Sequence, residues 1–133
     1  MEDMYRELIL DHARNRRNWG ALDPNDFDHY EKNPLCGDEL RLTLRIDENR
    51  IIREVGWEGS GCAISQASAS MLGEELVGMA LDDALKLDKQ HIFDNIGIPL
   101  SINRTKCALL ALKVLIVGSH GMRQWEQIED EED

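Results

Sequence analysis

Long hydrophobic runs are missing from this 133-residue sequence. None approaches the roughly 20 consecutive apolar residues that a transmembrane helix needs. The opening segment, "MEDMYRELILDHARNRRNWG", begins with acidic residues and has no long apolar core. It therefore resembles neither a signal peptide nor a transit peptide, and we expect no membrane partner and a cytoplasmic location.

Positive charge is also scarce. The chain has 15 Lys and Arg against 26 Asp and Glu, which gives a formal net charge of -11. Such a surface repels phosphate backbones, so we expect no nucleic-acid ligand and favour cationic partners or metal cations. Because six acids crowd into the final "EQIEDEED", we expect one domain over residues 1–124 and an acidic, disordered tail over 125–133.

One local exception to the acidic charge is the cluster of Arg14, Arg16 and Arg17. It is compatible with a solvated helix end, where cations complement the helix dipole, and with a docking patch for an acidic partner.

Cysteine is limited to Cys36, Cys62 and Cys107. An odd number does not suit a disulfide framework, so we expect free thiols in a reducing compartment. The absence of any CxxC pair excludes a zinc ribbon and a thioredoxin motif. No histidine is near a cysteine in sequence, which disfavours a cysteine hydrolase because its nucleophile needs a base.

Hydrophobic periodicity predicts an α+β domain in which helices cover a small antiparallel sheet. Apolar and polar residues alternate cleanly between residues 39 and 47, and a second apolar pattern follows a short turn, so the two segments predict a hairpin. The expected strands are 39–47 and 50–59, and the expected helices are 2–15, a segment starting near 62, 81–87 capped by Asp82, and 107–123. The segment 20–34 is expected to be a loop that Trp19, Phe27 and Tyr30 hold against the core.

The expected hairpin brings Cys36 and Cys62 to the same end of the sheet, because antiparallel strands enter and leave at one end. Cys107 joins them if the last helix packs with its N-terminus at that end, where helix dipoles favour thiolates. With Asp38 as an oxygen donor, three thiolates and one carboxylate supply the four ligands of tetrahedral Zn²⁺. The alternatives are buried cysteines that act as small hydrophobic residues and an aspartate that serves the turn.

Three segments, "NPLCGD", "GSGCAISQASASM" and "RTKCALLAL", resemble the signatures of the iron–sulfur cluster assembly scaffold family, which includes IscU, SufU and the N-terminal domain of NifU. The resemblance extends to about residue 118. It implies an α+β fold with a small antiparallel sheet and a metal site made of Cys36, Asp38, Cys62 and Cys107. It also implies that zinc, iron or a transient [2Fe–2S] cluster is bound there.

The family receives sulfur from a pyridoxal-phosphate cysteine desulfurase, and its members either build a cluster for acceptor proteins or relay the sulfur. We expect Cys36 to accept the sulfur, because its loop is the most mobile of the three cysteine-bearing segments. Arg104 and Lys106 resemble the SufU pattern, whereas the short spacing from Cys62 to Cys107 resembles IscU. Arg104 and Lys106 are either partner contacts or solvated cations.

We therefore expect an iron–sulfur cluster assembly protein, with a zinc-dependent sulfur relay as the alternative. A structural zinc module is disfavoured, because closed structural sites use four Cys or Cys and His ligands.

Overall fold

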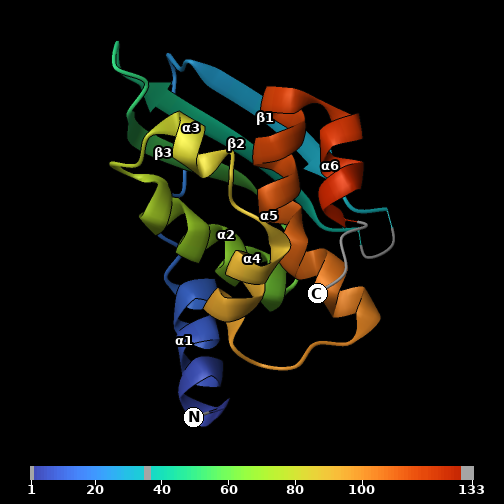
Figure 1. Cartoon of the computed structure of the whole chain (residues 1–133). Coiled ribbons are helices and arrows are strands. Elements are labelled where there is room, and N and C mark those ends of the chain that lie inside the picture. The colour runs from blue at the N-terminus through green and yellow to red at the C-terminus, as the bar shows by residue number, and fades with distance from the viewer. Residues whose placement is uncertain (1, 35–36, 130–133) are drawn as a thin grey trace.

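A computed structural model describes residues 2–34 and 37–129 of the chain (Figure 1). A three-stranded antiparallel sheet in the order β1-β2-β3 carries helices α2 and α5 against it, and α1 packs on α2. The elements are α1 (Glu2–Arg14), β1 (Phe27–Lys32), β2 (Glu39–Ile46), β3 (Ile52–Ser60), α2 (Ala63–Leu76), α3 (Leu81–Ala84), α4 (Lys89–Ile96), α5 (Ile102–His120) and α6 (Met122–Glu129). The α+β prediction is confirmed. Within the described residues, no helix is long and apolar enough to cross a membrane.

Strands β2 and β3 form the predicted hairpin. Leu40, Leu42 and Leu44 are completely buried on the inner face of β2, and Leu42 stands opposite the buried Trp57 of β3. Alternation of apolar and polar residues is enough to fix this register, because a one-residue slip would turn the leucines toward solvent.

Strand β1 was missed by the sequence prediction, which assigned its residues to a loop. It pairs with β2 at the edge of the sheet, from Phe27 opposite Leu44 to Lys32 opposite Glu39. Phe27 packs on the core as expected, but Tyr30 is half exposed, so its predicted role as an anchor is wrong. An edge strand with polar side chains is stabilised largely by backbone pairing, which leaves little apolar pattern to detect.

Helix α5 is the central packing helix and is buried along most of its length. It begins at Ile102, five residues before the predicted start, because Ser101 is its N-cap and accepts a hydrogen bond from the Arg104 N–H at 3.3 Å. In α3 the predicted cap is wrong. Ala80 is the N-cap, and Asp82 instead forms an ion pair with Arg50 at 2.8 Å.

Helix α6 corrects the predicted domain boundary. Residues 125–129 were assigned to a disordered tail, but they are helical, and Trp125 and Ile128 are buried. Their spacing of three residues puts both side chains on the face that packs against α5. The remaining tail residues, 130–133, lie outside the described residues.

Replacing the indole of Trp125 with a methyl group tests this boundary. We expect Trp125→Ala to lower the free energy of unfolding by about 3 kcal/mol, as for other buried aromatic residues. Gln124→Ala, an exposed neighbour in the same helix, serves as the control. Urea denaturation measures both variants, and equal stability of the two would mean that α6 contributes nothing to the core.

His12 joins α1 to α2 through a buried polar contact. Its Nδ1 lies 2.7 Å from Ser70 Oγ, which also accepts a hydrogen bond from the Arg17 N–H at 2.9 Å. Glu74 Oε1 lies 3.5 Å from the other ring nitrogen. Burial lowers the pKa of His12, and the nearby Arg17 lowers it further. The fold therefore favours neutral imidazole.

This lowered pKa predicts a pH-dependent stability. Below the ordinary histidine pKa of about 6.5, the unfolded chain takes up a proton that the folded chain resists. The free energy of unfolding therefore decreases as the pH is lowered. We expect His12→Gln to remove part of this fall between about pH 7 and the lowered pKa of the folded state. Parallel urea-midpoint profiles for the two proteins across this range would contradict the assignment.

Candidate metal centre

Three of the four predicted ligands converge at one end of the sheet. One ligand atom each from Asp38, Cys62 and Cys107 lies within 4.8 Å of the other two. Asp38 directly precedes β2, Cys62 is the N-cap of α2, and Cys107 lies in the second turn of α5. The fourth predicted ligand, Cys36, lies outside the described residues.

The strand register explains why Asp38 meets Cys62. Glu39 pairs with Ser60 at the end of the β2–β3 ladder, and only Gly61 and Cys62 separate β3 from α2. Asp38 is 3% exposed, and its Oδ1 accepts a hydrogen bond from the Cys62 N–H at 3.0 Å. Its Oδ2 accepts a weaker bond from Cys62 Sγ at 3.5 Å. The carboxylate therefore binds both the backbone and the thiol of the N-cap residue.

These donors fit a tetrahedral divalent metal. With metal–sulfur and metal–oxygen bonds of about 2.3 and 2.0 Å, tetrahedral geometry separates a sulfur and an oxygen ligand by about 3.5 Å. The 3.5 Å between Asp38 Oδ2 and Cys62 Sγ matches this separation. Asp38 and Cys107 are both at least nine-tenths buried. Ionised groups at such depth need a positive partner, so a cation suits the site.

Side chains that were not predicted to take part in the site form hydrogen bonds to the backbone around Cys62. Ser65 Oγ donates to the Cys62 carbonyl at 3.1 Å, and Gln66 Nε2 donates to the Gly61 carbonyl at 2.5 Å. Arg16 donates to Gln66 Oε1 at 2.9 Å and lies 4.4 Å from the centre of the Trp19 ring. Arg16 therefore stabilises, through Gln66, the backbone at Gly61 and Cys62.

The other two members of the arginine cluster differ from Arg16 in their contacts. Arg17 pairs with Asp11 at 2.6 Å, while Arg14 is exposed at the end of α1.

The prediction for Cys107 needs a correction. Because α5 starts at Ile102, the thiol is not at the N-terminus of the helix, and the dipole effect falls off within the first turn. Arg104 is exposed, and none of the described acidic residues pairs with it, whereas Lys106 lies 3.7 Å from Glu129 of α6.

The sequence model of the family described as "NifU-like N terminal domain" matches residues 4–129. The chain belongs to this family. Its relatives include the zinc-dependent sulfurtransferase SufU of Bacillus subtilis, with 35% identity over 89% of this chain and 90% of that protein. The iron–sulfur cluster assembly scaffold protein IscU of Thermotoga maritima is 34% identical over 84% of this chain and 89% of that protein. A zinc-dependent sulfurtransferase and a cluster assembly scaffold protein are thus similar to this chain at nearly equal identity.

Two solved structures have the same fold. A candidate iron–sulfur cluster assembly scaffold protein for the SUF system from Fervidobacterium islandicum superposes with a TM-score of 0.74 at 26% identity, covering 84% of this chain and 93% of that one. A NifU-like protein from Brucella abortus, at 20% identity, gives a TM-score of 0.68 and covers 98% of each chain, which supports the fold alone.

Gly61 offers a test of the geometry of the centre. A Cβ at this position would stand 2.7 Å from Asp38 Cγ and 2.5 Å from Ser65 Oγ. We expect Gly61→Ala to displace the Asp38 carboxylate and to weaken zinc binding by about tenfold or more, as substitutions around metal ligands do. Ser60→Ala, at the exposed neighbouring residue, is the matched control. Competition with a chromophoric chelator measures both, and wild-type affinity in Gly61→Ala would refute this geometry.

Proposed function

We propose that the protein accepts sulfur from a pyridoxal-phosphate cysteine desulfurase and binds iron or a transient [2Fe–2S] cluster for transfer to acceptor proteins. The proposed ligands are Cys36, Asp38, Cys62 and Cys107. The observation that carries the proposal is the convergence of Asp38, Cys62 and Cys107 in a chain of the NifU-like family. The relatives described as scaffold proteins for iron–sulfur cluster assembly support it.

Zinc is proposed to occupy the centre before sulfur arrives, where it would keep the bound thiols deprotonated and therefore nucleophilic. Asp38 would hold its position through the hydrogen bond that its Oδ1 accepts from the Cys62 N–H. A carboxylate oxygen exchanges more readily than a thiolate, which suits a site that must also release its cargo. Of the two described cysteines, Cys62 is partly exposed and Cys107 is buried. This difference favours Cys107 as a retained ligand.

The sulfur step is proposed to be a thiolate exchange. A cysteine thiolate of this chain attacks the terminal sulfur of the desulfurase persulfide, and a new sulfur–sulfur bond forms as the bond within the partner's persulfide breaks. The partner leaves as a thiolate, so electrons balance without an external oxidant or reductant. Cys36 is the proposed acceptor.

Arg104 and Lys106 are the proposed partner contacts beside the centre. Arg104 is exposed in the first turn of α5, so a partner can reach it directly. Lys106, the residue before Cys107, would first have to leave Glu129, which lies 3.7 Å away with both side chains partly exposed.

A zinc-dependent sulfur relay that does not build a cluster is the second candidate. Lys106 precedes the third cysteine as in the SufU pattern, and the relative described as a zinc-dependent sulfurtransferase is 35% identical.

Reconstitution with a cysteine desulfurase, L-cysteine, ferrous iron and a thiol reductant, with and without added zinc and followed by an acceptor apoprotein, distinguishes these functions. We expect a visible [2Fe–2S] spectrum whose intensity falls over time as the cluster passes to an acceptor apoprotein. In Asp38→Ala the cluster should persist longer, because the exchangeable oxygen ligand is lost. Asp28→Ala, at an exposed carboxylate on the sheet edge, is the control.

A zinc-dependent rise in desulfurase turnover without a cluster spectrum would favour the relay. If no cluster spectrum forms and desulfurase turnover does not change, both candidate functions are contradicted.

A further inference from the structure

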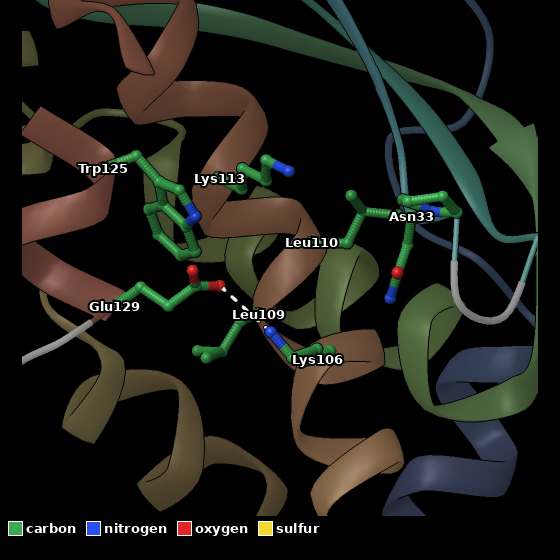
Figure 2. Close-up of a pocket in the computed structure, with 8 residues that line it drawn as sticks. Asn33, Lys106, Leu109, Leu110, Lys113, Trp125 and Glu129 are labelled. Carbon is green, nitrogen blue, oxygen red and sulfur yellow. Dashed lines mark ion pairs between the residues drawn. The ribbon is translucent and has the colours of Figure 1, made fainter. Parts of the chain in front are cut away.

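A small pocket lies between α5, α6 and the residues that follow β1 (Figure 2). Its volume of about 180 Å³ is below the range of roughly 300–1,000 Å³ typical of drug-sized ligands, so it accommodates only a few heavy atoms. Its lining residues are Asn33, Pro34, Lys106, Leu109, Leu110, Lys113, Trp125 and Glu129.

The indole N–H of Trp125 has no hydrogen-bond acceptor among the described residues, although the side chain is 2% exposed. Figure 2 shows the ring reaching from α6 with its nitrogen on the edge that faces the α5 side chains. A buried donor without an acceptor is rare in folded proteins, so the pocket favours a group that brings an oxygen.

Two lysines add positive charge to the same pocket. Lys106 lies 3.7 Å from Glu129, and Lys113 lies 3.9 Å from Glu31. Both separations exceed hydrogen-bond length, and in the described part of the chain no oxygen accepts a hydrogen bond from either ammonium group. Lys106, Lys113 and Trp125 therefore line one space, whose apolar walls are leucine side chains and the indole ring.

We propose that this pocket binds the carboxylate of a small organic acid. Two ammonium groups and one N–H suit a planar carboxylate, while Leu109 and Leu110 suit a short apolar substituent. In Figure 2 the Glu129 carboxylate lies beneath the ring and is directed to Lys106, so a ligand would have to displace this partly exposed side chain. Carboxylate binding in this pocket is independent of the proposed metal chemistry, because none of the described metal ligands lines the pocket.

Nuclear magnetic resonance of the ¹⁵N-labelled full chain tests the proposal with sodium acetate as the probe. Trp125 is one of three tryptophans, and its indole signal is assigned by its loss in Trp125→Phe. We expect acetate to shift this signal saturably, while the Trp19 and Trp57 signals stay in place. Sodium chloride at equal ionic strength should produce no saturable shift.

Two pocket variants and one control variant test the contributions of the lining residues. Lys113→Met should raise the acetate dissociation constant by about tenfold, as for the loss of one charge-assisted hydrogen bond. Lys86→Met, at an exposed lysine that does not line the pocket, should leave the constant unchanged. Glu129→Gln should lower the constant by up to about fivefold, because a competing exposed ion pair is removed.

Linear shifts of equal size in acetate and chloride, or unchanged acetate binding in Lys113→Met, would overturn the proposal. Tighter binding of inorganic phosphate than of acetate would overturn the assignment to carboxylates.

Discussion

The contact between the Asp38 carboxylate and Cys62, the N-cap residue of α2, joins the two parts of the candidate metal centre. One oxygen accepts a hydrogen bond from the Cys62 N–H. The other lies 3.5 Å from the Cys62 sulfur, a separation that suits two ligands of one tetrahedral metal. A helix N-terminus attracts negative charge, so the carboxylate is held in place without a cation. The same charge, buried beside two thiols, makes a cation favourable there. One interaction thus serves both the fold and the chemistry of the site.

Close packing around this contact leaves little freedom at the connection between β3 and α2. Gly61 has no room for a side chain, and Gln66, in the first turn of α2, donates a hydrogen bond to the Gly61 carbonyl. Farther along α2, Gly73 allows the helix to approach Trp57, since a Cβ there would stand 2.7 Å from the indole nitrogen. The small residues of α2 therefore bring the helix, and Cys62 with it, against the sheet.

Much of this arrangement could be predicted because it follows from local patterns. Alternation in β2 fixed which side of the strand faces the core, and antiparallel pairing then placed Asp38 beside Cys62. The support from Arg16 to Gln66 joins residues 50 apart and depends on tertiary packing, so no local pattern indicated it. The six terminal acids outweighed the spacing of Trp125 and Ile128, which was the available signal for α6. Strand β1 and the early start of α5 were missed because polar residues dominate both segments.

One carboxylate and three thiolates are proposed to share a single metal. X-ray absorption spectroscopy at the zinc edge of the zinc-loaded full chain measures this ligand set directly. We expect three sulfur scatterers at about 2.3 Å and one oxygen at about 2.0 Å, with the oxygen contribution altered in Asp38→Ala. A shell of four sulfurs, or an unchanged spectrum in Asp38→Ala, would contradict it.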